Sequence, residues 1–281
     1  MLTVLIPVDS SKSASNAIRY ALQLSKVIDS KFIFFHSEVI PTPITSDAAV
    51  LPVQIDEATI RENLSSNVER IFESLKITPD PNQISYKIAD GFSIGTSILD
   101  AVEKLKPDLI IMGTAGASGL KKVLMGSNVV DVISRANVPV LAVPETYDFK
   151  PVEKILHASD LRQLNDELHV VIPWAELFDA TIEVAHISDV TEEDEERITK
   201  AQNEIERKSY KKINLFTESI TFGRSLSDDL KRLMARHHPD MVIMFRHEHN
   251  WLGRLFMISH TDQIAFETRV PLLAINMKKK Q

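Results

Sequence analysis

PDLIIMGTAGASGLKKVLMGSN, residues 107–128, is the stretch of sequence that decides the fold. Its first part, DLIIMG at 108–113, is a short apolar run that predicts a strand buried on both faces. The next part holds four of the eight glycines of the chain: Gly113, Gly116, Gly119 and Gly126. A helix is predicted to begin near residue 127. The order of strand, glycine-rich loop and helix is typical of α/β domains.

The glycine-rich loop has the chemistry of an anion site. Glycine lets the backbone approach a ligand closely, and successive free N–H groups form an anion-binding concavity. The start of the following helix adds unpaired N–H groups and a positive dipole end. Ser127 is suited either to cap this helix or to donate its hydroxyl to a phosphate. The sequence therefore predicts phosphate binding between residues 113 and 127.

The loop has three other interpretations. Glycines that only serve turns would make it a plain surface loop, which the strand–loop–helix context disfavours. The pattern G-x-x-x-x-G-K-[ST] is absent, because no Lys-Ser/Thr pair follows the glycines. The pattern G-x-G-x-x-G is also absent, and the loop follows the fourth predicted strand rather than the first. A Walker-type motor and a standard dinucleotide-binding dehydrogenase are therefore not supported.

Outward from the loop, strand and helix patterns alternate. Strands are predicted at 2–8, 31–37, 83–89, 108–113 and 138–144, and helices at about 12–29, 55–76, 94–105 and 127–136, with a loop at 40–53 and a turn at Gly91. Such alternation predicts an α/β class, doubly wound fold with a parallel sheet and helices on both faces. Ligands of these sheets bind beyond the carboxyl ends of the strands, where strand order reverses.

The second half of the chain repeats the first. KILHASDLR (154–162) matches TVLIPVDSS (3–11), and PDMVIMF (239–245) matches PDLIIMG (107–113) at an offset of 132 residues. The same offset relates RVPLLAI (269–275) to NVPVLAV (137–143). A repeat this regular indicates duplication. We therefore expect two tandem domains, residues 1–147 and 148–281, each with a five-stranded parallel sheet.

Composition narrows the function classes. The chain has 281 residues, a formal net charge of −7 and no cysteine. A net acidic surface disfavours nucleic-acid binding, and the lack of cysteine excludes disulfides and Cys-ligated metals. No apolar run is long enough to span a bilayer, and the first residues do not resemble a signal peptide. We expect a cytoplasmic protein that binds neither nucleic acid nor membrane.

Gly113-x-x-Gly116-x9-Gly126-Ser127 resembles the G-x-x-G-x9-G-[ST] signature of universal stress proteins of the UspA type. LIPVDSS (5–11), FFHS (34–37) and NVPVLAVP (137–144) also resemble segments of that family, in the same order. The resemblance covers the whole chain as two tandem copies and is weaker in the second. It implies a strand order of 3-2-1-4-5 in each domain. It also implies a bound nucleotide, usually ATP with a divalent cation, Mg²⁺ or Mn²⁺.

The resemblance implies a set of nucleotide contacts in the first copy. Asp9 would accept the ribose hydroxyls, although capping the next helix is an alternative role for it. The main chain of Ser37 would contact the adenine edge, and Asn128 departs from the family, which often has an apolar residue there. The full set is Pro7, Val8, Asp9, Ser37, Met112, Gly113, Gly116, Gly126, Ser127 and Asn128.

The second copy departs from the signature. At the offset of 132, Phe245, Glu248 and Ile258 replace Gly113, Gly116 and Gly126. Side chains at these positions would crowd a phosphate, and Glu248 would repel it. Asp160 survives in place of Asp9. We expect that the second domain does not bind ATP in the same way.

Histidines raise a separate possibility in the second copy. His247 and His249 flank Glu248, and His260 is expected nearby, so these imidazoles are weak candidates for a metal site. A polar surface loop is the simpler interpretation. His36 and His186 occupy equivalent strand ends, where we expect them to serve packing.

The sequence favours a nucleotide-dependent stress or regulatory protein. No nucleophile–base–acid constellation emerges, so slow ATP hydrolysis is the most that it predicts. A slow ATPase or nucleotidyl-transfer enzyme, and an interaction module without nucleotide, are the alternatives. The resemblance also implies that the last strands, 139–144 and 271–276, pair as a pseudo-dimer within one chain. The sequence leaves open homodimerisation, the protein partner and the choice between ATP and AMP.

Overall fold

The computed structural model describes residues 1–39, 56–114, 126–188, 191–219, 226–246 and 269–277. The chain divides into two compact units, Met1–Tyr147 and Asp148–Gln281. Each unit has its own strands and its own helices.

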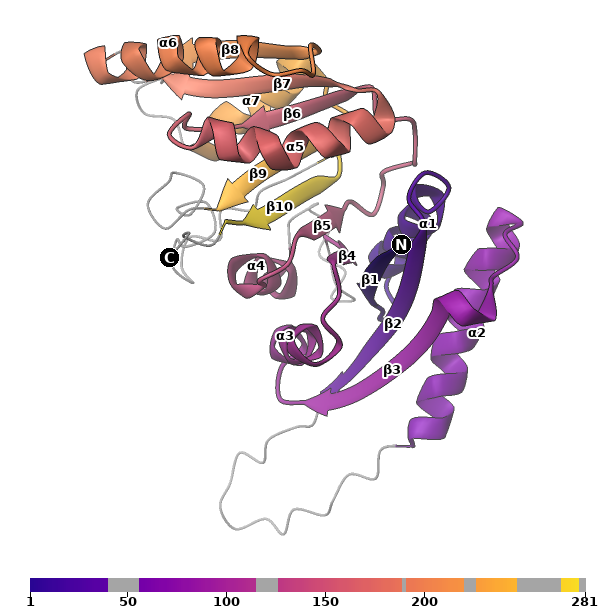
Figure 1. Ribbon diagram of the computed structural model, residues 1–281. Coiled ribbons are helices and arrows are strands. Elements are labelled where there is room, and N and C mark those ends of the chain that lie inside the picture. Colours follow the sequence, from indigo (N-terminus) through magenta and orange to yellow (C-terminus); the bar gives the residue numbers. More distant parts are fainter. Residues whose placement is uncertain (40–55, 115–125, 189–190, 220–225, 247–268, 278–281) are drawn as a thin grey trace, which may run out of the picture. The chain divides into compact units, whose positions relative to one another are not determined.

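The first unit is a parallel sheet with helices on both faces (Figure 1). Its sheet order is β3-β2-β1-β4-β5, so the predicted order 3-2-1-4-5 is confirmed. Helices α1 and α2 pack together, as do α3 and α4. The elements are β1 (Leu2–Pro7), α1 (Lys12–Leu24), β2 (Ser30–Val39), α2 (Glu57–Leu75), the 3-10 turn η1 (Pro81–Gln83), β3 (Ile84–Gly91), α3 (Ile94–Leu105), β4 (Leu109–Gly113), α4 (Ser127–Arg135) and β5 (Val140–Val143).

The second unit has the equivalent sheet, in the order β8-β7-β6-β9-β10. Its described elements are β6 (Lys154–Ala158), α5 (Leu164–Phe178), β7 (Thr181–Ser188), α6 (Glu192–Glu206), β8 (Ile213–Ser219), α7 (Leu226–His237), β9 (Met241–Arg246) and β10 (Leu272–Asn276). Helices α5 and α6 pack together, as α1 and α2 do in the first unit.

The two sheets share their strand register. Val4 on β1 lies opposite Phe32 and Leu109. Ile155 on β6 lies opposite Ile182 and Met241, which are the equivalent residues of the repeat. A one-residue slip would turn every side chain to the other face, so a shared register preserves the same core in both copies.

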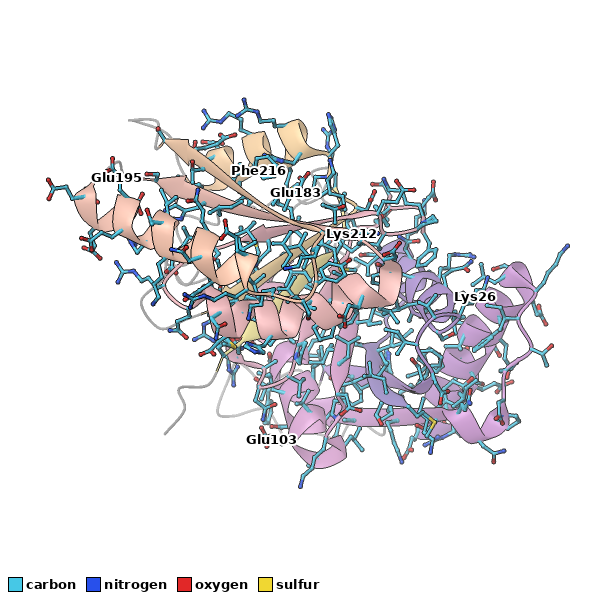
Figure 2. The ribbon with its side chains drawn as sticks, turned by 45° about the horizontal axis from the view of Figure 1, so that its top comes forward. Lys26, Glu103, Glu183, Glu195, Lys212 and Phe216 are labelled. Atoms are coloured by element: carbon cyan, nitrogen blue, oxygen red, sulfur yellow. The ribbon has the colours of Figure 1, made fainter. Side chains whose placement is uncertain are left out.

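The apolar runs of the sequence form the central strands of the sheets, where their side chains are buried. Leu109, Ile110 and Ile111 on β4 are fully buried, as are Val242 and Ile243 on β9. Charged side chains lie on the outside, such as Glu103 on α3 and Glu195 on α6 (Figure 2). None of the helices in the described ranges is long and apolar enough to cross a lipid bilayer.

Two predicted boundaries were wrong. Helix α1 ends at Leu24 rather than near residue 29, and Val27 is 50% exposed instead of lying on a buried helical face. Strand β3 runs through Gly91, where a turn was expected, because β2 continues as far as Val39 and pairs with it. The side chain of Ser97 fills the space where a Cβ at Gly91 would lie.

Gly113, the last residue of β4, lies directly against helix α1. A Cβ at this position would be 2.5 Å from the carbonyl carbon of Ser13 and 2.6 Å from its carbonyl oxygen. Both are backbone atoms, which cannot move aside as the end of a side chain can. The absence of a side chain at Gly113 is therefore what allows α1 to pack on β4.

We predict that Gly113→Ala lowers the free energy of unfolding by about 1–3 kcal/mol, since the added methyl group overpacks a backbone contact. Urea denaturation of both proteins measures the change. Gly95→Ala in α3 is the matched control. Its added Cβ would meet the Asp131 carboxylate, which can swing away, and alanine favours a helix over glycine. Equal stability of the Gly113→Ala variant and the wild type would contradict the packing role.

Candidate functional site

A cavity lies at the carboxyl ends of β1, β2 and β4 in the first unit. Nine of the ten residues predicted to contact nucleotide line it: Pro7, Val8, Asp9, Ser37, Met112, Gly113, Gly126, Ser127 and Asn128. The tenth, Gly116, lies outside the described residues. Sequence positions more than 100 residues apart thus meet at one edge of the sheet, at the place where strand order reverses between β1 and β4.

The cavity lining contains both apolar and polar residues. Its apolar part includes Val8, Phe35 and, from helix α3, Ile94 and Ile98. Its polar part includes residues of the junction between β4 and α4. Strand β1 lies between β2 and β4, and Asp9 follows it. At the usual strand spacing, two strands span about 10 Å.

Asp9 does not cap the helix that follows it. The N-cap of α1 is Ser11, whose Oγ accepts a hydrogen bond from Ala14 N at 3.0 Å. Asp9 uses Oδ1 to accept from Ser11 N at 2.9 Å, which fixes the direction of its carboxylate. The capping role considered for Asp9 therefore belongs to Ser11. The remaining oxygen of Asp9 is available to a ligand in the cavity.

The junction of β4 and α4 offers main-chain donors. Gly126 is the N-cap of α4, makes no side-chain cap and donates its N–H to Thr114 O at 2.6 Å. Ser127 is the first helical residue, so its hydroxyl is not a cap. The first N–H groups of a helix have no partner within it, so those of Ser127 and Asn128 have the chemistry to bind an anion. The dipole of α4 adds positive charge at the same end of the cavity.

Two hydroxyl groups of this region are buried without a hydrogen-bond partner in the described part of the chain. Ser37 Oγ belongs to a cavity residue of β2, and Thr114 Oγ1 lies just after β4. Unpaired buried polar groups are uncommon in proteins and cost free energy.

His36 links β2 to the end of β1. Its Nδ1 lies 2.9 Å from Val8 O and its Nε2 lies 3.2 Å from Glu38 Oε2. Because a carbonyl oxygen only accepts, Nδ1 carries a proton and donates. The sequence assigned His36 to packing, whereas the structure gives it a polar role in holding Val8, a cavity residue.

Several cavity residues were not predicted from the sequence: Ser11, Ala14, Phe35, Ile94, Ile98 and Val129. Ile94 and Ile98 are four positions apart and so share a helical face. That spacing was visible in the sequence, but it is also the ordinary pattern of a helix packed on a sheet.

The equivalent end of β9 in the second unit carries a buried aromatic side chain. Phe245, at the position of Gly113, is 1% exposed, and its ring packs edge-on against His157 with centroids 5.3 Å apart. At Gly113 even a single Cβ would meet the backbone of α1, so a phenyl ring would not fit in the same space. Leu161, just before α5, has a left-handed φ of 63°, whereas no residue between β1 and α1 has a positive φ.

A buried group of polar side chains adjoins this ring. Glu167 on α5 is 1% exposed and accepts from Ser159 Oγ at 2.5 Å. His157 Nε2 lies 2.9 Å from the same carboxylate, and its Nδ1 lies 3.2 Å from Ile243 O. The three side chains satisfy one another inside the unit. None of them presents an open reactive group.

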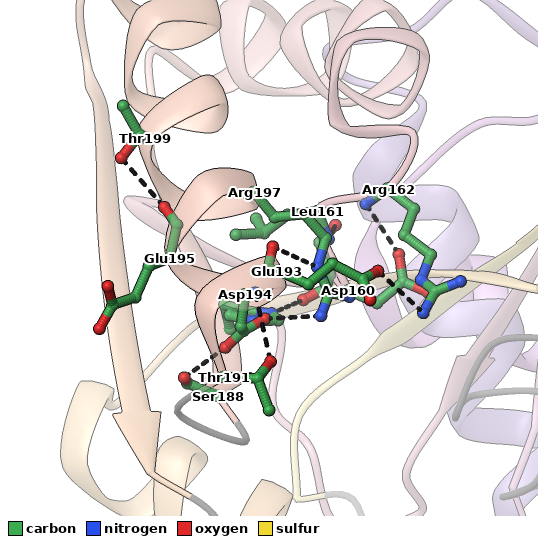
Figure 3. A network of polar contacts seen from close by, with 12 residues as sticks. Asp160, Leu161, Arg162, Ser188, Thr191, Glu193, Asp194, Glu195, Arg197 and Thr199 are labelled. Atoms are coloured by element: carbon green, nitrogen blue, oxygen red, sulfur yellow. Dashed lines mark hydrogen bonds and ion pairs between the residues drawn. The ribbon is translucent and has the colours of Figure 1, made fainter.

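A second buried network joins β7 to the start of α6 (Figure 3). Asp194 accepts a hydrogen bond from Ser188 and lies 2.9 Å from His186 Nε2 and 3.0 Å from Arg197. His186 Nδ1 donates to Ser159 O at 3.0 Å, as His36 does to Val8 O in the first unit. Burial acts to raise the pKa of Asp194. The hydrogen bonds from Ser188 and His186 and the charges of His186 and Arg197 outweigh burial and lower this pKa.

Comparison with known proteins decides the family. The model of the universal stress protein family matches residues 1–144 and again 151–276. The chain belongs to the universal stress protein family. It carries two copies of the family domain, as the sequence predicted.

Relatives and solved structures agree with this assignment. Universal stress protein MJ0531 of Methanocaldococcus jannaschii is 29% identical over 142 residues, which are 50% of this chain and 80% of the relative. Universal stress protein MJ0577 of the same organism is 26% identical over 152 residues, covering 50% of this chain and 93% of the relative. A universal stress protein structure from Archaeoglobus fulgidus has the same fold over 100% of this chain and 98% of its own, with a TM-score of 0.65 at 18% identity.

The metal candidates of this universal stress protein, His247, His249 and His260, lie outside the described residues. Within the described ranges, no group of three or more His, Asp or Glu side chains is arranged to hold a metal ion.

We predict that the second domain loses stability in acid through Asp194. A carboxyl group whose pKa is lowered by folding stabilises the fold above its unfolded pKa, near 3.8, and this contribution disappears as pH falls through the lower folded value. Asp194→Asn should lower stability at pH 6 and flatten the decline below about pH 4. Urea denaturation across this pH range measures both effects.

Asp100→Asn is the control for this experiment, because Asp100 is exposed on α3. It should leave the pH profile of the wild type unchanged. An Asp194→Asn profile that declines as steeply as the wild-type profile would contradict the role given to Asp194.

Proposed function

We propose that this universal stress protein binds ATP in its first domain and acts as a nucleotide-dependent regulatory protein. The supporting observation is the single cavity that gathers nine of the ten residues implied by the family signature. The cavity combines an apolar wall, the carboxylate of Asp9 and the N–H groups at the start of α4. These three surfaces suit the base, the ribose and the phosphates of a nucleotide.

Each part of the nucleotide has a place in this arrangement. The base would lie against Phe35, Ile94 and Ile98 at the β2 end. The free oxygen of Asp9 would accept the ribose hydroxyls, because an ionised carboxylate is an acceptor only. The N–H groups of Ser127 and Asn128, together with the Ser127 hydroxyl, would bind phosphate oxygens. Their spacing along the sheet edge, about 10 Å from β2 to β4, suits a nucleotide laid across the strands.

Mg²⁺ or Mn²⁺ would accompany the phosphates. Mg²⁺ in nucleotide sites usually keeps several waters and takes its ligands from one or two protein groups and the phosphates. Asp9 is the only carboxylate among the described residues that line the cavity. The cation would therefore depend on the phosphate oxygens for its position.

The residue composition of the cavity lining favours binding over catalysis. The described lining contains a single titratable side chain, Asp9, and its proposed partner is the sugar. A regulatory role needs only that nucleotide occupancy stabilise one arrangement of β4 and α4, which a protein partner would then recognise. Pairing of the two domains through their last strands, homodimerisation and a cytoplasmic location stay predictions of the sequence.

We propose that the second domain does not bind ATP in this way. The ring of Phe245 lies where the first domain has the bare backbone of Gly113. Asp160 keeps the local geometry of Asp9, since its Oδ1 accepts from Arg162 N at 3.0 Å. Asp160 alone does not form a phosphate site, because the end of β9 carries the Phe245 side chain instead of a bare glycine backbone.

The first test identifies the ligand. Mass spectrometry of small molecules released from the purified protein should detect an adenine nucleotide, and Gly126→Glu should abolish it through charge repulsion. Gly126 has a φ of −64°, a backbone conformation open to any residue, so the variant should fold. Absence of nucleotide, with no thermal shift on addition of Mg-ATP, would favour the interaction module. Single-turnover hydrolysis well above background would favour the enzyme.

The second test uses the repeat as its own control. We predict that Asp9→Asn weakens ATP binding about tenfold to a hundredfold, because an amide donor replaces one acceptor of charge-assisted hydrogen bonds. The asparagine can still accept from Ser11 N, so the local turn is kept. Asp160→Asn, the equivalent change in the second domain, should leave the affinity unchanged. Isothermal titration calorimetry measures both, and a larger effect of Asp160→Asn would refute the assignment to the first domain.

A further inference from the structure

A second cavity lies in the second unit, at the amino ends of its strands, and has a volume of about 570 Å³. Three segments of the chain meet there. Lys150 comes from the stretch before β6, Lys231 and His238 come from α7 and the residue that follows it, and Arg269 precedes β10. In a parallel sheet the amino and carboxyl ends of the strands lie at opposite edges. This cavity is therefore distinct from the position that corresponds to the nucleotide cavity.

The cavity is lined by positive charge. Its described lining contains two lysines, one arginine and one histidine but no carboxylate, in a chain whose net charge is −7. Behind the lining, Asp240 Oδ1 lies 2.5 Å from Lys150 Nζ. The other oxygen of Asp240 accepts from Glu153 N at 2.9 Å and from Lys154 N at 3.0 Å. Because this one buried carboxylate faces three donors, it orients Lys150 without balancing the charge of the cavity.

The end of α7 does not by itself account for these cations. A cation near a helix C-terminus interacts favourably with the helix dipole, and Lys154 has this role, because its Nζ donates to His237 O at 2.8 Å. Lys150 and Arg269, in contrast, come from segments outside the helix. Gathering like charges costs stability through repulsion. A bound anion would offset this cost.

The first copy of the repeat shows that the fold does not require this charge. At the offset of 132 residues α3 corresponds to α7, and the residues that follow the two helices, Lys106 and His238, have nearly the same left-handed φ, 47° and 48°. The two helices therefore end in the same way. On the helices themselves, Lys231 stands where the first copy has Leu99.

Two further positions change in the same direction. In the first unit, Asn137 Nδ2 donates to Glu103 Oε1 at 2.9 Å. The second unit has Arg269 in place of this asparagine and Ala235 in place of the glutamate. The pair of an amide and a carboxylate has thus become a guanidinium beside a methyl group. Each change makes the corner more positive, and the smaller side chain leaves room for a ligand.

We propose that this cavity binds a small organic phosphate. A phosphate dianion accepts hydrogen bonds from several cations at once, and the guanidinium of Arg269 can bind two of its oxygens. Met234, Pro239 and Val270 line the same cavity and would contact the organic part. The volume is that of a site for a small molecule. Every lining residue belongs to the second unit, so the inference does not depend on nucleotide binding by the first.

Phenyl phosphate is the probe, because it joins a phosphate group to an apolar ring. The titrated protein carries Gly126→Glu, which keeps the probe from the proposed phosphate site of the first domain. Calorimetry should show one site per chain. Arg269→Asn and Lys231→Leu, which introduce the residues of the first copy, should each lower the affinity about tenfold to a hundredfold through loss of a charge-assisted contact. Benzoate, with one negative charge on the same ring, should bind more weakly.

Lys200→Gln is the matched control, because Lys200 is 71% exposed on α6 and the change removes the same charge. It should bind phenyl phosphate as the starting protein does. Without ligand, the melting midpoint of Arg269→Asn should equal or exceed that of the starting protein, because one of several like charges is removed. A lower midpoint, no binding of phenyl phosphate, an unchanged affinity of Arg269→Asn or an equal loss in Lys200→Gln would overturn the inference.

Discussion

The contact between the bare backbone at Gly113 and the first turn of α1 is the constraint on which the rest of the first domain depends. Because a Cβ there would meet backbone atoms of Ser13 at 2.5 and 2.6 Å, α1 packs as closely on β4 as the chain allows. This packing positions the loop after β1, and with it Asp9, beside the start of α4. The glycine that the sequence assigns to phosphate binding thus also has a packing role. One residue serves both the core and the cavity.

The second domain lacks this constraint and differs accordingly. Phe245 replaces the glycine, the chain before α5 takes a left-handed turn at Leu161, and Glu167 on α5 joins Ser159 and His157 in a closed polar group. The sheet itself keeps its order and register. The strands therefore keep one core in both domains, while the residues at their carboxyl ends differ.

Histidine–carboxylate pairs occupy the same strand position in both domains. His36 and His186 each donate from Nδ1 to the main chain at the end of the first strand of their domain. Their second nitrogens face Glu38 and Asp194, and only the latter pair is fully buried and reinforced by an arginine. In the second domain this pair connects β7 to the start of α6. A histidine at this position therefore ties two neighbouring strand ends together in both copies.

The sequence alone determined the architecture of this protein. Short buried strands, amphipathic helices and the offset of 132 residues between PDLIIMG and PDMVIMF made the α/β class and the duplication predictable. The resemblance to universal stress proteins supplied the strand order and the family. Tertiary structure alone decided how the site is built. The packing role of Gly113, the cap at Ser11, the unpaired hydroxyl of Ser37 and the apolar wall of Ile94 and Ile98 all depend on contacts between residues far apart in the chain. Local sequence patterns specify which face of an element is apolar, but the atoms that meet across elements are set only when the elements pack.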